Sequence, residues 1–173
     1  MKLAKPLVLT GMMGSGKTSI GKVLAQRLQV PFYDLDEEIE REQKATVRDI
    51  FSKYGEGVFR RIEKQKLQNL LLKGPQVIAT GGGAVIDEGT RSLLHECAIP
   101  VWLKADVEVL EKRVAGDDTR PLLAGDDPKK VLRRILEQRT PYYAQAPIVL
   151  VNNGNNVEAA ADELMAMLGN YIR

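Results

Sequence analysis

The sequence has few of the side chains that build disulfides, zinc sites and histidine-based hydrolases. Its 173 residues include one cysteine, Cys97, and one histidine, His95. A single cysteine excludes an intrachain disulfide, and the two residues together are too few for a zinc site. The segment 93–97 is typical of a helix end, so we interpret both as helix surface and packing rather than as part of a Ser-His-Asp triad. One thiol also fits a reducing cytoplasm.

The chain also has little net charge and no long apolar run. Its 25 basic and 23 acidic residues leave a net charge of +2, which gives no support for a nucleic-acid or membrane-surface partner. No stretch approaches the roughly 20 apolar residues of a membrane-spanning helix. The apolar run 6–10 is too short for the hydrophobic region of a signal peptide. We expect a cytoplasmic protein without nucleic-acid or membrane partners, and we expect a monomer.

Short apolar runs alternate with amphipathic helical segments along the chain. Five runs rich in Val, Ile and Leu are typical of parallel strands buried on both faces. They are residues 7–10, 31–34, 76–80, 99–103 and 148–151. The spacing of apolar residues and the start signals predict helices at 17–28, 58–72, 106–114, 128–138 and 157–171. This alternation predicts a single α/β domain over residues 1–173, with a five-stranded parallel sheet and helices on both faces.

Two segments interrupt the alternation of strands and helices. The segment between the second and third strands, about 36–72, is long enough for two or three helices. The segment from about 115 to 127 is rich in Gly, Asp and Pro, and it carries Arg120. A long loop of this kind in a compact domain is typical of either a functional lid or a disordered segment.

Residues 11–18 match the phosphate-loop pattern G-x-x-x-x-G-K-S/T, between a predicted strand and a predicted helix. The glycines let the backbone turn tightly, so that its N–H groups and the helix N-terminus face phosphate oxygens. In such a loop Lys17 reaches the β- and γ-phosphates and the Thr18 hydroxyl binds Mg²⁺. We therefore expect nucleotide contacts from Gly14, Ser15, Gly16, Lys17, Thr18 and Ser19.

The acidic residues separate this chain from other nucleotide-binding classes. No carboxylate follows the third predicted strand, where motor and transport NTPases hold Mg²⁺, and no guanine-reading N-K-x-D pattern occurs. Asp34 and Asp36 instead end the second strand. If that strand continues, its two-residue period places both on one side, at the edge of the sheet where ligands bind in open α/β folds. Alternatively, Asp36 caps a helix that begins near Glu37.

Six patterns follow one another along the chain: Gly11–Thr18, Asp34-x-Asp36, Phe59-Arg60-x-x-Glu63, Gly81-Gly82-Gly83, Arg120-Pro121-Leu122-Leu123 and Arg139-x-Pro141-x-Tyr143. Shikimate kinases carry the same patterns in the same order, and the chain resembles that family over essentially its full length. The resemblance implies a P-loop kinase sheet of strand order 2-3-1-4-5, an acceptor-binding insertion at about 36–72 and a lid at about 115–127. It also implies transfer of the γ-phosphoryl of ATP to the 3-hydroxyl of shikimate, with Mg²⁺, in aromatic amino acid biosynthesis.

The resemblance further implies a role for each matching position. The implied catalytic residues are Lys17, Asp36 and Arg120. The implied magnesium ligands are Thr18 and Asp34. The implied acceptor-binding residues are Asp36, Arg60, Gly81, Gly82, Gly83 and Arg139. Beyond the phosphate loop, the implied nucleotide contacts are Arg113, Arg120 and Asn155. The segment near Asn153 matches the family less clearly.

Physical chemistry supports part of this assignment and leaves alternatives open. Arginine forks bind a carboxylate in a partly dry pocket better than lysine does. Arg60 and Arg139 are far apart in the sequence, so as a clamp they should face one cleft from separate helices; the alternative is that both are ordinary surface arginines. Glu63, one turn after Arg60, either orients its guanidinium or forms a surface pair. The triple glycine either keeps side chains out of the acceptor site or forms a flexible turn. The rival functions are another small-molecule kinase, of the gluconate or nucleotide type, and a non-catalytic nucleotide switch.

Overall fold

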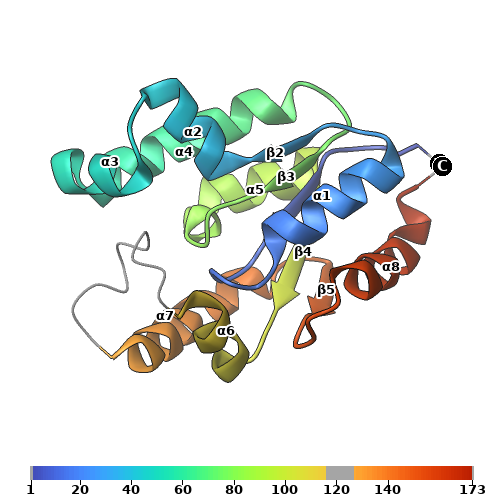
Figure 1. The fold of residues 1–173 in the computed structure, drawn as a ribbon. Helices are drawn as coiled ribbons and strands as arrows, with labels where there is room; N and C mark the ends of the chain where they lie inside the picture. Colours follow the sequence, from blue (N-terminus) through green and yellow to red (C-terminus); the bar gives the residue numbers. More distant parts are fainter. Residues whose placement is uncertain (1, 116–126, 173) are drawn as a thin grey trace.

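A five-stranded parallel sheet forms the centre of the molecule in the computed structural model, which describes residues 2–115 and 127–172 (Figure 1). Its strands are β1 (Leu7–Thr10), β2 (Phe32–Asp34), β3 (Val77–Ala79), β4 (Ile99–Lys104) and β5 (Ile148–Val151). They are ordered β2-β3-β1-β4-β5. This is the predicted order, and each strand lies within one residue of its predicted bounds at either end.

The parallel register brings the carboxyl ends of all the strands to one edge of the sheet. Leu9 of β1 is paired with Ala79 on one side and with Val101 on the other. The chain therefore leaves β1, β2 and β3 at the same edge, where the phosphate loop, Asp36 and the triple glycine follow these strands. Sequence positions more than 60 residues apart meet there because the strands are parallel.

Helices cover both faces of the sheet (Figure 1). The core on one face is formed with α1 (Lys17–Leu28) and α8 (Val157–Met167). The core on the other is formed with α2 (Leu35–Gln43), α3 (Val47–Tyr54), α4 (Glu56–Leu71), α5 (Glu88–Cys97), α6 (Val107–Val114) and α7 (Pro128–Tyr143). Two short 3-10 turns, η1 (Ala84–Ile86) and η3 (Leu168–Asn170), complete the described elements. None of the described helices is long and apolar enough to cross a membrane.

The strands alternate between these two cores because successive side chains point to opposite faces. Leu7 and Leu9 belong to the core beneath α1 and α8, whereas Val8 belongs to the other core. β5 differs from the prediction of a strand buried on both faces, since Val149 and Val151 are exposed. The physical reason is its place at the end of the sheet, where only one of its faces is packed into a core.

Capping side chains set several helix boundaries. Thr46 and Asp49 form a capping box at α3, and Asp87 caps α5. The helix predicted at 128–138 extends to Tyr143, through Pro141. A proline in a helix removes one backbone hydrogen bond, but here Arg139 and Tyr143, on either side of it, are buried. Tertiary packing of this last turn outweighs the local penalty.

Candidate active site

A cavity of about 690 Å³ opens at the carboxyl edge of the sheet, within the size range of small-molecule sites. The predicted site residues that line it are Gly14, Gly16, Lys17, Thr18, Ser19, Asp34, Asp36, Arg60, Gly81, Gly82, Gly83, Arg113, Arg139 and Asn155. Ser15 is fully buried and lies outside this lining. Arg120 and most of the predicted lid lie outside the described residues.

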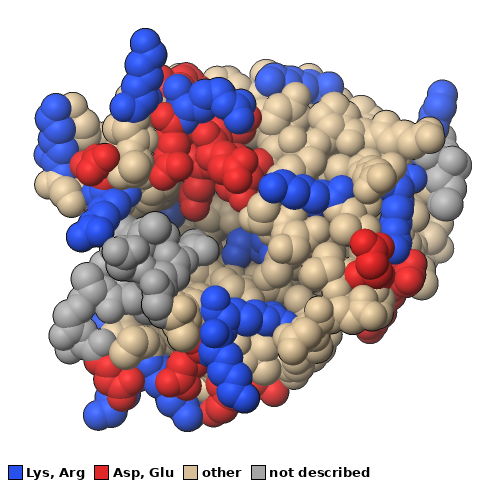
Figure 2. Space-filling model, in the orientation of Figure 1, with Lys and Arg blue, Asp and Glu red and all other residues tan. Residues whose placement is uncertain are grey.

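The surface around the cavity is divided by charge. Figure 2 shows a hollow with acidic side chains over α2 on one side, basic side chains over α6 on the other and a basic side chain within it. The first turn of α2 contains three acidic residues, Asp36, Glu37 and Glu38. A hollow with cations inside it suits an anionic ligand, and the acidic rim suits hydroxyl groups or a bound cation.

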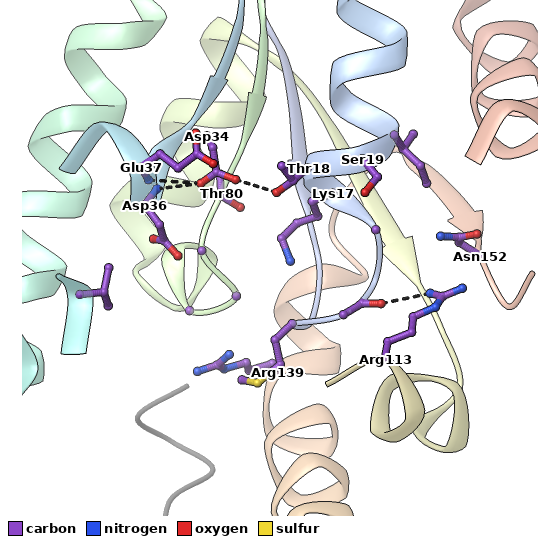
Figure 3. Close-up of a pocket in the computed structure, with 18 of the residues that line it drawn as sticks. Lys17, Thr18, Ser19, Asp34, Asp36, Glu37, Thr80, Arg113, Arg139 and Asn152 are labelled. Atoms are coloured by element: carbon purple, nitrogen blue, oxygen red, sulfur yellow. Dashed lines mark hydrogen bonds between the residues drawn. The ribbon is translucent and has the colours of Figure 1, made fainter. Parts of the chain in front are cut away.

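The phosphate loop presents backbone N–H groups at the start of α1. Gly14 and Gly16 have φ angles of +78° and +98°, a conformation that strongly favours glycine. No side chain of the described residues caps α1, and its first turn holds no acidic residue. The Lys17 ammonium donates to the carbonyls of Gly11 and Met12, each at 2.7 Å, and its side chain points into the cavity (Figure 3). These features make an anion site at the helix N-terminus.

The junction of β2 and α2 places two carboxylates beside this loop. The Thr18 hydroxyl donates to Asp34 Oδ2 at 2.6 Å, and Asp34 Oδ1 accepts from the backbone N–H groups of Asp36 and Glu37 (Figure 3). The helix cap is therefore Asp34, so the alternative in which Asp36 caps is wrong. Asp36 lies in the first helical turn rather than on a continued strand, because the strand ends at Asp34. Both acids nevertheless line the cavity.

The oxygen donors at this junction fit a magnesium ion. A hydroxyl and a carboxylate are hard ligands, and Mg²⁺ in phosphate-transfer sites usually takes one or two protein oxygens together with phosphates and water. Thr18 and Asp34 supply such a pair at the mouth of the phosphate loop. No group of three or more metal-binding acidic, histidine or cysteine side chains exists among the described residues, so an ion here would depend on the nucleotide for other ligands.

Arg60, on α4, is held at the other end of the cavity by two carboxylates. Its guanidinium pairs with Glu63 at 2.7 Å and with Glu56 at 3.2 Å, and it lies over the rings of Phe51 and Phe59. The predicted pairing with Glu63 is thus confirmed. Burial alone would lower the pKa of Arg60, but the carboxylates of Glu63 and Glu56 outweigh it and raise the pKa. Arg60 therefore stays charged.

Glu63 is buried almost completely, at 2% exposure. Burial raises the pKa of its carboxyl above the ordinary value, and the Arg60 guanidinium offsets this only in part. Its second oxygen, Oε1, has no hydrogen-bond partner among residues 2–115 and 127–172. The raised pKa of Arg60 favours a charged ion pair, whereas the raised pKa of Glu63 opposes one. We assign the raised pKa of Glu63 to its burial, since Arg60 also pairs with Glu56.

Arg139 reaches the same end of the cavity from α7. It is 5% exposed, and Figure 3 shows its guanidinium at the side of the cavity opposite the phosphate-loop helix. The hydroxyl of Tyr143, on the same helix, donates to the carbonyl of Gly82. Burial raises the pKa of Tyr143 and keeps it neutral. The two arginines of the predicted clamp therefore face one cavity from separate helices, as predicted.

The triple glycine lets these charged groups pack directly against the backbone. A Cβ at Gly83 would lie 2.2 Å from an Arg60 nitrogen, and one at Gly82 would lie 2.8 Å from an Arg139 nitrogen. At Gly81 it would lie 2.6 Å from Glu63 Oε1. None of the three has the positive φ that only glycine readily adopts. The glycines are needed for close approach to the site's own side chains, rather than for a flexible turn.

The end of the cavity nearest β5 includes residues that sequence reasoning missed. Asn152 donates from Nδ2 to the Ser15 carbonyl at 2.9 Å, and Gly154 and Val157 also line the cavity. Arg113 donates to the carbonyls of Gly14, at 3.1 Å, and Gly154 (Figure 3). Asn152 could have been found from its place directly after a strand, at the edge where ligands bind. Thr80, which directly follows β3, carries the same signal and was also missed.

The strand order, the phosphate loop and a cavity with clustered cations opposite that loop define a P-loop kinase for a small acceptor. Comparison with known proteins gives the family. The sequence model of the shikimate kinase family matches residues 13–169. Shikimate kinases of Cereibacter sphaeroides and Bartonella quintana are 48% and 42% identical, over 92% and 97% of this chain and 80% of each relative.

Solved structures agree with this match. The shikimate kinase from Acinetobacter baumannii in complex with shikimate has a TM-score of 0.92 and 37% identity, covering 98% of this chain and 96% of that one. A gluconokinase from Sinorhizobium meliloti, with a TM-score of 0.64 and 19% identity, shares the fold alone. The chain belongs to the shikimate kinase family, and it is an ATP-dependent kinase.

Proposed function

We propose that this chain transfers the γ-phosphoryl group of ATP to the 3-hydroxyl of shikimate, giving shikimate 3-phosphate and ADP. The observation that carries the proposal is a single cavity lined by Lys17 of the phosphate loop, by Asp36, and by Arg60 and Arg139. Donor phosphates at the loop and an acceptor carboxylate at the arginines would place the acceptor's ring between them. This is the arrangement that direct transfer requires.

The acceptor end suits a carboxylate on a ring. Two guanidinium groups from α4 and α7 offer paired, charge-assisted hydrogen bonds, which arginine provides with fixed geometry. Arg60 is already oriented by Glu63 and Glu56, so little side-chain entropy remains to be lost on binding. The backbone at Gly81, Gly82 and Gly83 would form the wall against which the ring lies.

Asp36 would hold the attacking hydroxyl. It lies on the first turn of α2 and points into the cavity on the side facing Lys17 (Figure 3). Because phosphoryl transfer passes through a loose transition state, aiming the hydroxyl matters more than removing its proton early. We therefore assign Asp36 to orienting the hydroxyl and accepting its proton as the bond forms. The Lys17 ammonium would contact the β- and γ-phosphate oxygens and neutralise their charge.

Thr18 and Asp34 would hold Mg²⁺, as their hydrogen bond and their hard oxygen donors suggest. A magnesium ion held there would supply positive charge that offsets the negative charge of the phosphates. Gly14, Ser15, Gly16 and Ser19 would bind phosphates through the loop, and Arg113 and Asn155 would lie at the nucleoside end. Arg120, outside the described residues, remains a prediction. It would close over the γ-phosphate and exclude water.

We also propose that the chain acts as a monomer in the cytoplasm. All groups named for donor and acceptor belong to one chain, so the proposed site needs no second copy. The segment 36–72, which folds as α2, α3 and α4, would serve as the acceptor-binding insertion of a single domain.

The test is ADP release from Mg-ATP, measured with shikimate, gluconate or AMP as acceptor. We expect release with shikimate only, and we expect a folded Lys17→Ala variant to lose it. Release with gluconate or AMP but not shikimate would retain a P-loop kinase and contradict the carboxylate clamp. If the protein binds ATP but releases no ADP with any of the three acceptors, a nucleotide switch would be favoured.

A further inference from the structure

The loop that follows β5, residues 152–156, contains four asparagines and one glycine; we call it the base loop. Its first residue is fixed from two sides. The backbone N–H of Asn152 donates to the Lys104 carbonyl at 2.7 Å, and its side chain donates to the carbonyl of Ser15 in the phosphate loop. The Gly154 carbonyl accepts from Arg113. The base loop is thus joined both to the phosphate loop and to α6.

A second contact joins the base loop to the opposite end of α6. The backbone N–H of Asp106 donates to Asn153 Oδ1 at 2.8 Å, and Asn153 Nδ2 donates to Asp106 Oδ2 at 3.0 Å. Asp106 is the N-cap residue of α6, a position where a carboxylate usually accepts from the helix's own N–H groups. Here the described residues include no such bond, and the carboxylate instead binds Asn153.

Helix α6 therefore holds the base loop at both of the helix's ends. Asp106 binds Asn153 at the N-terminus, and Arg113 binds Gly154 in the last turn. Because Arg113 also donates to the Gly14 carbonyl, the position of α6 sets the separation between the phosphate loop and the base loop. In Figure 3, Arg113 and Asn152 lie on the same side of the phosphate loop.

We propose that Asn153 is a positioning residue for the nucleotide, which holds the base loop at the spacing that the base and sugar require. The proposal rests on the proposed function only in assigning this end of the cavity to a nucleoside. Asn153 is exposed and outside the cavity lining, so its effect passes through Gly154 and Asn155. Preorganising a binding loop strengthens binding by reducing the ordering that accompanies it.

The pair has little to do with holding the fold together. The α8 helix that follows is capped independently, since Asn156 Oδ1 accepts from the Ala159 N–H at 3.0 Å. The strand and the first loop residue are fixed by backbone bonds and by buried Asn152. Loss of the Asn153–Asp106 pair should therefore move the base loop without unfolding its neighbours. It should leave the acceptor end unchanged.

The experiment uses a charge swap. Asn153→Asp sets two carboxylates against each other, whereas the double variant Asp106→Asn, Asn153→Asp restores a donor and an acceptor with the pair reversed. Asn156→Asp is the matched control, because it adds the same charge to the same loop and an aspartate still caps α8. ADP affinity is measured by calorimetry, and KM for ATP and for shikimate by initial rates.

We expect Asn153→Asp to weaken ADP binding and raise KM for ATP by roughly threefold to tenfold, the loss of a single polar pair. KM for shikimate should not change, the double variant should regain the wild-type affinity, and Asn156→Asp should match the wild type. Asn153→Ala should show the same loss without repulsion.

The proposal is overturned if both Asn153 variants bind ADP as the wild type does, or if the swap fails to restore affinity. It is also overturned if KM for shikimate rises in parallel, or if Asn156→Asp has an equal effect. Calorimetry with ADP needs no acceptor. A wild type that binds ADP but does not phosphorylate shikimate would therefore contradict the proposed function while still testing Asn153.

Discussion

Arg60 illustrates how single residues of this site serve both binding and folding. Its guanidinium contacts two carboxylates and lies over two aromatic rings, so its position is fixed by protein groups on several sides. The sequence predicted its ion pair with Glu63 from helical spacing, but it did not predict the rings or the near-complete burial of Glu63. Burial depends on the packing of α4 against the sheet, and no local pattern records it.

We predict that Arg60→Lys raises KM for shikimate and leaves KM for ATP unchanged. Lysine keeps a positive charge beside buried Glu63, but it lacks the fork that binds a carboxylate through two bonds. KM for shikimate should rise roughly tenfold, which corresponds to a loss of about 1.4 kcal/mol of charge-assisted hydrogen bonding. Steady-state kinetics measure it, and the exposed neighbour Arg61→Lys is the control. A rise in KM for ATP instead would contradict the assignment.

At Gly83 we predict a loss of acceptor binding. The added methyl of Gly83→Ala would overlap the Arg60 guanidinium, which would have to leave its binding position and weaken its ion pair with buried Glu63. Steady-state kinetics should therefore show a higher KM for shikimate. Gly57→Ala, on the same α4 helix and with no atom within 4 Å of its new Cβ, should leave KM unchanged. Equal KM values in the two variants would refute the argument.

The β2–α2 junction shows how secondary structure elements place the catalytic groups. Asp34 ends the strand, caps the helix and accepts from Thr18, all through one carboxylate. The sequence predicted that both Asp34 and Asp36 face the ligand edge, but for the wrong reason. Strand periodicity assumes that β2 continues, whereas α2 begins at Leu35. No local pattern indicated that α7 would continue past Pro141 either.

The two roles of Asp34 can be separated by two substitutions. Asn is as good an N-cap as Asp, so Asp34→Asn should keep the free energy of unfolding while sharply raising the Mg²⁺ concentration needed for turnover. Asp34→Ala should lose both roles, with a stability loss of about 1 kcal/mol. Urea unfolding and a magnesium titration of the rate measure the two effects. Normal magnesium dependence in Asp34→Asn would show that its role is capping alone.

For the molecule as a whole, the parallel sheet explains most of what the sequence predicted. Strand runs, helix starts and the phosphate loop are local patterns, and the resemblance supplied the strand order that joins them. The sequence did not predict the hydrogen bonds of Asn152, Asn153 and Thr80, because each bond joins segments that are distant in the chain. The exposure of β5 was missed because a sequence run does not show which strand lies at the end of a sheet.

Burial of Glu63 has a consequence for the stability of the whole protein. Its folded-state pKa is raised above the ordinary value of 4.5, so in the pH range just above that value the folded state binds more protons than the unfolded state. The free energy of unfolding must then fall as the pH rises through this range. We predict that, as the pH rises through this range, the free energy of unfolding of the wild type falls relative to that of Glu63→Gln, measured by urea unfolding at several pH values. If the wild type instead becomes more stable relative to Glu63→Gln as the pH rises, Arg60 must lower the pKa of Glu63.

The claim that one cavity joins donor and acceptor is tested most directly by measuring ADP and shikimate 3-phosphate together in one reaction with Mg-ATP. If the cavity aligns both substrates and excludes water, the two products should form in equal amounts and only when shikimate is present. ADP released without shikimate, or without an equal amount of the 3-phosphate, would contradict the claim that this cavity joins the phosphate loop to a carboxylate-binding acceptor site.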